Sequence, residues 1–371
     1  MSRYQFELAT PADDADLRHI MASTPMDGSI VVSFRRDPSY FAAAVVEGRF
    51  RQVVAARDTH TGRLVGFGSR SISTKFINGA PTPIGYLSNL RLLPEHRSLG
   101  LIARGYRYFK DLHQDGRTKL YLTTIATQNR KALDVLTSKR AGLPHYQSAG
   151  DFHTFAIPTG PRWSHPLPPE GIEVREATAE DWPWIVEFAK SQGRRRQFFP
   201  EYQLQDFGDD QGLLRGIWLS DLRLAMDGHN IVGIAAIWNQ QRFRQTVIDS
   251  YRGTLQYSRG LLNLAAKLLD RPRLPHPGSQ IRAVNVAFPL ASHDDPEVFA
   301  ALVSRLLRDI SRQEADYLLI GIHESDPLLP VIGSFRGRCY TTRLFLVTWD
   351  DGHDLAASLD GRPPYLELGA L

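Results

Sequence analysis

The chain has 371 residues, of which 42% are hydrophobic, so it can bury the cores of two or three domains. Its 44 Lys and Arg residues only slightly outnumber its 40 Asp and Glu residues, which excludes the charge density of a dedicated nucleic-acid-binding protein. The one cysteine, Cys339, excludes an internal disulfide and a cysteine-based zinc site.

Three further expectations concern the cellular compartment, metal binding and Cys339. It has no run of 18 apolar residues, and its start, MSRYQFELATPADD, has no hydrophobic stretch like that of a signal peptide. We therefore expect a cytoplasmic protein without a membrane partner. The twelve histidines lack the spacing of metal ligands, so no metal site is expected. Cys339 lies in a strand pattern, and we expect it to be buried and unreactive.

The first predicted elements occur twice. Residues 6–20 (FELATPADDADLRHI) indicate a short strand, a capped turn and an amphipathic helix. Residues 174–188 (VREATAEDWPWIVEF) align with them without a gap and share the Ala-Thr pair and the following Asp. Farther along, 62–73 and 228–239 both indicate a polar turn that opens a strand. We infer two α/β copies of one plan.

A proline-rich segment separates the copies. PTGPRWSHPLPPEG, residues 158–171, contains five prolines, and proline at this density continues neither a helix nor a central strand. We therefore predict a first domain at 1–158, a linker at 159–170 and a second domain with a docked tail at 171–371.

A predicted strand, turn and helix follow one another in residues 84–113. IGYLSNLRLL (84–93) is strand-like, Pro94 ends it, and apolar residues recur at helical spacing through 101–113. The first N–H groups of such a helix are unpaired and favour an anion. Gly100 would let the backbone approach a ligand or adopt positive φ, and Arg97 would add a charged donor. The segment therefore predicts a pyrophosphate site, with an ordinary connection and a solvated arginine as the alternative.

This segment resembles motif A of the GNAT acyltransferase superfamily. The motif is Arg or Gln, two residues, Gly, one residue, then Gly or Ala, and it binds the pyrophosphate of acetyl-CoA. Arg97 and Gly100 match it, whereas Ile102 stands where a small residue is usual and could crowd the pyrophosphate. The resemblance implies an α/β fold with a mixed sheet and helices on both faces, in two tandem GNAT-like domains.

The next elements resemble motif B of the same superfamily. KLYLTTIATQ (119–128) indicates a strand, and NRKALDVLTSKRAG (129–142) indicates a helix that Asn129 would cap. In the family this asparagine contacts the pantetheine arm between two splayed strands; the alternative is that Asn129 only caps the helix. The resemblance thus implies that acetyl-CoA, or another acyl-CoA, contacts Leu90, Arg91, Leu92, Arg97, Ser98, Leu99, Gly100, Leu101, Ile102, Ala103, Asn129 and Ala132.

The second copy lacks the corresponding anion site. In AVNVAFPLASHDDPEVFAALVSRLL (283–307) the turn carries Asp294, Asp295 and Glu297 and no glycine. These carboxylates would complement the helix dipole themselves and repel a phosphate. We therefore expect the second copy not to bind CoA but to frame the acceptor site or stiffen the pair.

The usual acid and base of the family are missing. Leu136 stands where motif B often has a tyrosine, and the motif A strand has no carboxylate. The remaining candidates are Tyr86, Ser88 and Asn89 on the strand, Tyr121 and Tyr146 as acids, and Glu95 acting through water, with plain packing or solvation as the alternative for each. We predict acyl transfer to an amine of a small molecule or peptide; the alternative is a non-catalytic acyl-CoA-binding regulator or interaction module.

Two last segments carry weaker predictions. GRRRQFFP (193–200) could grip a phosphate or a nucleic acid, or could be a solvated basic turn beside a docked aromatic pair. The tail DGRPPYLELGAL (360–371) is apolar, and we expect it to dock and to border the acceptor cavity. A tandem member of the family uses its terminal carboxylate as the base, which Leu371 could do here; the alternative is that the tail only covers the core.

Overall fold

The computed structural model describes residues 3–138, 142–159, 171–208, 210–268, 273–310 and 315–371. Residues 160–170 of the predicted linker lie outside this part of the chain. The strands are β1 (Tyr4–Leu8), β2 (Ile30–Arg35), β3 (Phe50–Asp58), β4 (Leu64–Ile77), β5 (Ala80–Leu92), β6 (Tyr121–Ala126), β7 (His145–Pro158), β8 (Glu173–Glu176), β9 (Leu222–Asp227), β10 (Asn230–Trp238), β11 (Gln245–Tyr251), β12 (Ala283–Ala291), β13 (Tyr317–His323) and β14 (Arg338–Thr348). The helices are α1 (Asp14–Ser23), α2 (Tyr40–Ala43), α3 (Leu99–His113), α4 (Arg130–Leu136), α5 (Trp182–Gly193), α6 (Thr254–Leu268), α7 (Pro296–Ile310), α8 (Leu329–Ser334) and α9 (His353–Ala357).

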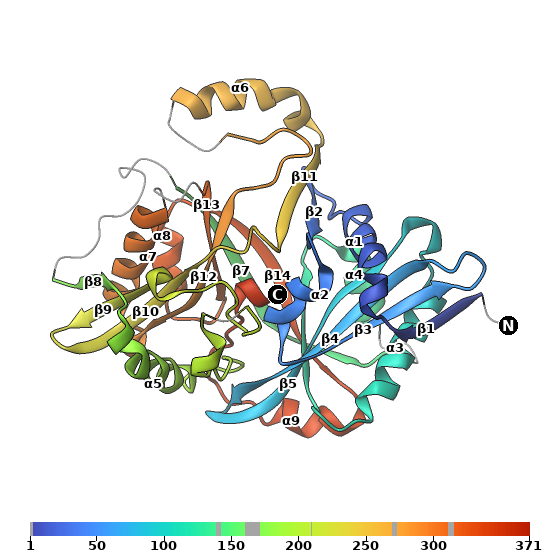
Figure 1. Cartoon of the computed structure of the whole chain (residues 1–371), viewed down its shortest axis with the longest axis horizontal. Helices are drawn as coiled ribbons and strands as arrows, with labels where there is room; N and C mark the ends of the chain where they lie inside the picture. The colour runs from blue at the N-terminus through green and yellow to red at the C-terminus, as the bar shows by residue number, and fades with distance from the viewer. Residues whose placement is uncertain (1–2, 139–141, 160–170, 209, 269–272, 311–314) are drawn as a thin grey trace.

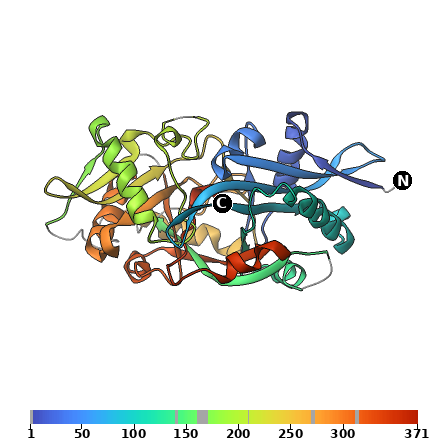
Figure 2. The same ribbon diagram turned by 90° about the horizontal axis from the view of Figure 1, so that it is seen from below.

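One mixed sheet of twelve strands runs the length of the molecule, in the order β1-β3-β4-β5-β6-β14-β7-β13-β12-β10-β9-β8. Figure 2 shows the two halves side by side along the long axis. β14, from the second half of the chain, lies between β6 and β7 of the first half, and β7 pairs in turn with β13. Each half therefore supplies a strand to the other, and the sheet is continuous across them.

Helices cover both faces of this sheet, as predicted. In the first half, α1 and α2 pack on one face, and α3 and α4 pack on the other. In the second half, α5 packs on one face, and α7 and α8 pack on the opposite face. The buried core therefore consists of two layers above and below a single sheet.

The repeated start forms the same cap in both halves. The side chain of Asp13 accepts hydrogen bonds from the backbone N–H and the hydroxyl of Thr10, and Asp181 does the same for Thr178. This reciprocal cap starts α1 and α5 at matching places. The shared Thr-x-x-Asp pattern thus has one local cause in both copies.

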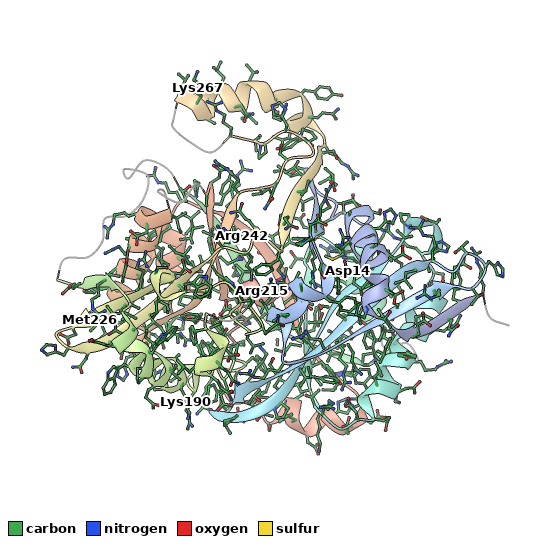
Figure 3. The ribbon with its side chains drawn as sticks, in the orientation of Figure 1. Asp14, Lys190, Arg215, Met226, Arg242 and Lys267 are labelled. Atoms are coloured by element: carbon green, nitrogen blue, oxygen red, sulfur yellow. The ribbon has the colours of Figure 1, made fainter. Side chains whose placement is uncertain are left out.

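A two-stranded sheet of β2 and β11 joins the two halves outside the main sheet. Beyond it, α6 stands apart from the body (Figure 1), and Lys267 marks its outer end in Figure 3. Five large apolar side chains on α6 are exposed: Tyr257, Leu261, Leu262, Leu264 and Leu268. Cys339 lies in β14 as expected, but its side chain is exposed rather than buried, because the start of β14 lies at the surface.

Candidate functional site

β5 and β6 run parallel but pair at only two positions, Gly85 with Tyr121 and Tyr86 with Leu122. Past Tyr86 and Leu122 the described residues of the two strands no longer pair. β6 continues its ladder with β14 from Tyr121 to Ala126. The sheet therefore opens between β5 and β6 toward their carboxyl ends.

A β-bulge at Asn89 shapes the free edge of β5. The register with β4 shifts between Phe67 and Ser69, and Asn89 has φ 55°. Asparagine tolerates this left-handed conformation better than most residues. An extra residue in one strand reverses the alternation of side chains beyond it. Leu90 and Leu92 consequently face α3, whereas Tyr86 and Ser88 lie on the other face.

The turn after β5 ends at an open helix N-terminus. The Ser98 hydroxyl caps α3 by accepting a hydrogen bond from the Leu101 N–H at 3.3 Å. Arg97 is exposed, and its Nε donates to the Leu92 carbonyl oxygen at 3.3 Å. Gly100 lies in the first helical turn with a negative φ, so the expected left-handed conformation is absent. A Cβ on Gly100 would meet no described atom within 4 Å, and the close approach of a ligand to this backbone stays a prediction.

The remaining residues of this helical turn pack against the sheet. Leu101 is buried, and Ala103 is half-buried. Ile102 is half-buried in the apolar cluster under α3 and lines a small cavity of about 20 Å³ there. Its branched side chain therefore has a place in the core beneath the helix.

Asn129 caps α4, because its Oδ1 accepts a hydrogen bond from the Ala132 N–H at 3.2 Å. The residue is exposed, at the end of β6 where β5 and β6 have separated. The capping interpretation is thus confirmed, while a contact of Asn129 or Ala132 with a pantetheine arm stays a prediction.

Comparisons with known proteins bear on the fold of the chain. Neither a protein-family model nor a curated protein sequence matches the chain. Solved structures match its fold. A GCN5-related N-acetyltransferase from Sphaerobacter thermophilus has a TM-score of 0.57 at 11% identity, over 100% of this chain and 99% of that one. A GCN5-related N-acetyltransferase from Anabaena variabilis has a TM-score of 0.53 at 12% identity. The match covers 93% of this chain and 72% of that one. Saccharomyces cerevisiae N-myristoyltransferase with bound myristoyl-CoA has a TM-score of 0.58 at 12% identity. The match covers 94% of this chain and 83% of that one.

The chain has a GNAT superfamily fold. Among the described residues, no group of three or more His, Cys, Asp or Glu side chains is placed to hold a metal ion. In the same part of the chain, no helix is long and apolar enough to cross a membrane.

Among the six candidates for the acid or base, Tyr86 and Ser88 lie on one face of β5, whereas Tyr146 lies apart from them. Tyr86 is buried, its hydroxyl is 2.7 Å from Thr124 Oγ1 across the opening, and burial raises the pKa of Tyr86 to about 12. Ser88, on the same face, accepts a hydrogen bond from Asn89 Nδ2 at 3.1 Å. Tyr146 lies on the opposite face in the apolar cluster under α3.

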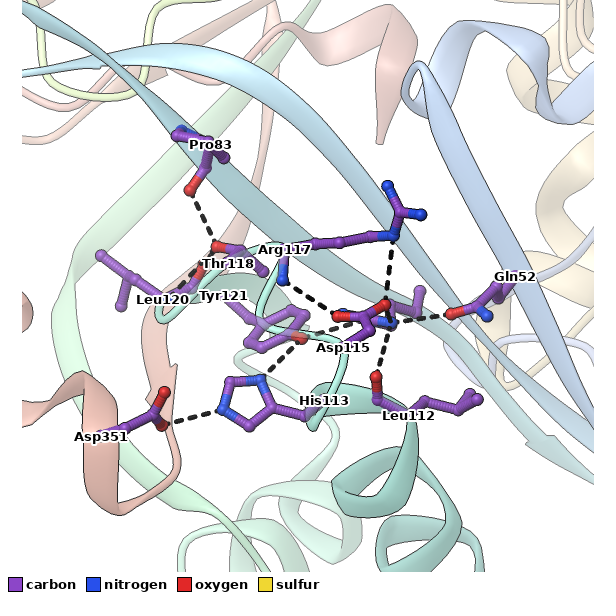
Figure 4. Close-up of polar contacts among 11 residues, drawn as sticks. Gln52, Pro83, Leu112, His113, Asp115, Arg117, Thr118, Leu120, Tyr121 and Asp351 are labelled. Carbon is purple, nitrogen blue, oxygen red and sulfur yellow. Dashed lines mark hydrogen bonds and ion pairs between the residues drawn. The ribbon is translucent and has the colours of Figure 1, made fainter.

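The other acid candidates also have structural partners or lie at the surface. The hydroxyls of Tyr146 and Tyr106 are 2.6 Å apart, and burial raises the pKa of Tyr146 well above its usual value. Tyr121 belongs to a network at the closed end of the opening (Figure 4). Glu95 is exposed in the turn before α3. Tyr86 is therefore the predicted acid that lies in the opening itself.

The network in Figure 4 fixes the closed end of the opening. Arg70 is buried and donates to both Asp115 oxygens at 2.8 Å and to the Tyr121 hydroxyl at 3.0 Å. His113 Nδ1 lies 3.1 Å from the same hydroxyl, and His113 Nε2 lies 2.8 Å from Asp351 Oδ1. These contacts tie the carboxyl end of α3 to β4, β6 and the segment after β14. The point at which β5 and β6 separate is therefore held in place by these contacts.

Sequence reasoning missed a group of buried polar residues on the face opposite α3. Tyr40 lies 2.7 Å from Ser69 and accepts from Asn89 Nδ2 at 3.4 Å, so it touches the bulge. Glu47 accepts from Arg36 and from Arg244, the latter at 2.6 Å. The side chain of Arg91, predicted to contact CoA, also lies on this face and donates to Thr24 Oγ1 at 2.9 Å. The one signal in the sequence is the polar segment SFRRDPSYF, residues 33–41.

The second copy repeats the opening and fills it. β12 and β13 pair only from Ala283 to Asn285, and Phe288 forms a bulge with φ 35°. The N–H at this bulge donates to Oε2 of Glu367, from the tail, at 3.1 Å. Asp295 caps α7 by accepting from the N–H groups of Glu297 and Val298. In the second copy, carboxylates of the chain thus occupy both the bulge and the helix N-terminus.

The tail docks as predicted. Tyr365 and Leu366 are buried, and the Gly369 carbonyl accepts from Gln240 at 2.8 Å. Leu371 packs against the apolar cluster that contains Tyr86, and its carbonyl accepts from Arg244 at 3.0 Å. Figure 1 places this end of the chain at the centre, between the halves.

The basic segment 193–200 is partly buried in the core of the second half. Arg196 is buried and pairs with Asp294 at 2.5 Å and with Asp326 at 3.4 Å. Phe198 and Phe199 are buried in the core. The aromatic pair is docked as one alternative predicted, and Arg194 and Arg195 are exposed, whereas Arg196 is buried in an ion-pair network rather than solvated.

Proposed function

We propose that the protein transfers an acyl group from acyl-CoA to an amine, with CoA bound in the first half. The observation that carries this proposal is the opening between β5 and β6, flanked by the bulge at Asn89 and the free N-terminus of α3. Because one fold can host several functions, the proposal rests on this site rather than on the fold alone.

The residues around the opening fit a CoA thioester. The open space at Gly100, the N-terminus of α3 with its helix dipole and the exposed Arg97 suit a pyrophosphate. The strand segment Leu90–Leu92 and Asn129, at the start of α4, would flank the pantetheine arm. We infer that the functional division follows residues 1–158 and 171–371, joined by 159–170, with CoA in the first part only.

The reaction joins the acceptor nitrogen to the carbonyl carbon. As the C–N bond forms, the C–S bond breaks, the amine loses a proton and the CoA sulfur gains one. Tyr86 is our candidate for the proton donor, because its hydroxyl lies in the opening and burial keeps it protonated, with a pKa of about 12. We propose acetyl-CoA as the donor to test first and a small molecule or peptide as the acceptor.

Calorimetry with acetyl-CoA tests the binding site. We expect one acetyl-CoA per chain and loss of binding in the Arg97→Glu, Gly100→Asp double variant, because both changes place negative charge at the helix N-terminus. Arg107→Glu, on the exposed side of the same helix, is the matched control and should bind normally. Absence of binding to the wild type, or undiminished binding to the double variant, would contradict the site.

A second candidate function is a non-catalytic acyl-CoA-binding regulator or interaction module. It is favoured by the motif A strand, which carries no carboxylate to act as a base. Thiol release from acetyl-CoA over a panel of amines and peptides distinguishes the two. Sustained turnover would exclude the regulator, and binding without turnover over a broad panel would favour it.

A further inference from the structure

Three guanidinium groups meet beside the bulge, on the sheet face opposite α3. Arg36 follows β2, Arg91 lies in β5, and Arg244 immediately precedes β11. We name them the arginine cluster. Glu47 pairs with two of them, Arg36 and Arg244. Even if Leu371 is counted as a carboxylate beside Arg244, three positive groups face two negative ones.

The cluster has unused hydrogen-bond donors. Arg36 is 4% exposed, and its Nη1 has no partner among the described residues. In the same part of the chain, Nε of Arg91 and Nε of Arg244 are also buried without a partner. Buried donors on charged groups are normally paired, so several at one place indicate a missing acceptor.

The excess charge also acts on the arginines themselves. Burial, and after it the neighbouring Arg36 guanidinium, lowers the pKa of both Arg91 and Arg244 to about 10. Like charges in a poorly solvated place repel one another, and an anion between them would remove that repulsion.

A cavity is lined by one member of the cluster, Arg36. It has a volume of about 270 Å³ and lies between α1 and the end of β2. Arg36 and Arg35 line it, together with Arg18, His19 and Asp37. Nε of Arg35 is buried without a partner among the described residues, as is Nη1 of Arg36. The exposed carboxylate of Asp37 pairs with Arg18 at 2.9 Å, so it does not neutralise the inner guanidinium groups.

The side chain of Tyr40 links the arginine cluster to the bulge. The Arg36 guanidinium lies 4.6 Å from the centre of the Tyr40 ring, and the Tyr40 hydroxyl accepts from Asn89 Nδ2 at 3.4 Å. Asp14, labelled in Figure 3, holds α2 in place by accepting from Ser39 Oγ and from the Tyr40 N–H. A molecule with one end at Arg36 could therefore place its other end near the opening between β5 and β6.

We propose that the acceptor carries, besides its amine, an anionic oxygen group, a carboxylate or a phosphate, which binds to Arg36 with support from Arg91 and Arg244. This inference rests on the proposed acyl transfer at the same opening. Guanidinium groups bind both kinds of anion through charge-assisted hydrogen bonds.

Matched acceptor pairs test it. With saturating acetyl-CoA, thiol release is measured for glycine against glycinamide and for phosphoethanolamine against ethanolamine. We expect kcat/KM for the anionic member of at least one pair to exceed that of its neutral partner by about tenfold or more. The pair that responds identifies the anion as a carboxylate or a phosphate. Equal rates within both pairs would overturn the inference.

Variants locate the effect. Arg36→Gln should remove the preference and leave acetyl-CoA binding intact, and Arg36→Lys should retain part of it. Arg91→Gln is a second test should Arg36→Gln fold poorly, and Arg63→Gln, an exposed arginine of the same half, is the control. A preference that survives both Gln variants would contradict the assignment.

A separate measurement distinguishes this inference from the proposed function. If acetyl-CoA does not bind, the proposed function fails on its own. Calorimetry with glycine and with inorganic phosphate then measures directly whether the arginine cluster binds an anion. Binding of either that Arg36→Gln abolishes would support the anion site, and absence of Arg36-dependent binding would overturn it.

Discussion

The ring of Tyr121 lies directly against Gly85, so that a Cβ on residue 85 would come within 2.1 Å of Tyr121 Cδ1. These two residues are also a paired position of β5 and β6 at the closed end of the opening. Tyr121 cannot move away easily, because its hydroxyl is held by Arg70 and His113. The start of the opening is therefore fixed by close packing and by hydrogen bonds together.

Gly85→Ala should destabilise the protein by about 1–3 kcal/mol, since the extra methyl group overpacks this contact. Urea unfolding followed by circular dichroism measures the change. Gly100→Ala is the control, because a Cβ there meets no described atom within 4 Å, and its stability should stay within about 0.5 kcal/mol of wild type. Equal stability of the two variants would show that the Gly85 contact is looser than described.

Tyr86→Phe and Tyr146→Phe should separate catalysis from packing. If Tyr86 donates the proton, its loss should lower kcat for acyl transfer by about 100-fold or more. Loss of its hydrogen bond to Thr124 should lower stability by about 1 kcal/mol, as in the second variant. Tyr146→Phe removes the hydrogen bond to Tyr106 and should lower stability by about 1 kcal/mol while kcat stays near wild type. A normal kcat for Tyr86→Phe would rule out its role as the acid.

Glu367 should hold the filled opening of the second half together. Its Oε2 accepts from the Tyr365 hydroxyl at 2.7 Å, the Tyr202 hydroxyl at 3.0 Å and the Phe288 N–H at 3.1 Å. Glu367→Ala leaves three buried donors unpaired and should cost at least about 2 kcal/mol. Glu367→Gln keeps an acceptor oxygen and should cost less than about 1 kcal/mol. Thermal unfolding at pH 7 compares them, and similar losses would mean that the hydrogen bonds contribute little.

Lys75 predicts how stability changes at alkaline pH. Burial lowers its pKa from the usual 10.5 to about 8, against the opposing effect of Glu367. Between these values the unfolded chain binds a proton that the folded chain does not, so stability should rise with pH. The free energy of unfolding of the wild type, minus that of Lys75→Met, should therefore increase from pH 7 to 9.5. A constant or falling difference would contradict the lowered pKa.

Features built from neighbours in the chain were predictable. The Thr-x-x-Asp starts of α1 and α5, the strand and helix on either side of Arg97 and Gly100, and the cap at Asn129 all form as expected. Each depends on hydrogen bonds over three or four residues, or on an apolar repeat that matches one type of secondary structure. The conformation of Gly100 was not predictable, because the motif is compatible with a turn or with the first turn of a helix.

The sequence by itself determined the repeated Thr-x-x-Asp starts, the turn with Arg97 before α3 and the carboxylate-rich turn before α7, since local patterns carry all three. Only the tertiary structure decided that β14 lies between β6 and β7, that Tyr146 lies on the face opposite Tyr86, and that Arg244 pairs with Glu47, 197 residues away. Contacts of that range depend on which strands pair and which side chains are buried together, and periodicity along the chain carries no information about either.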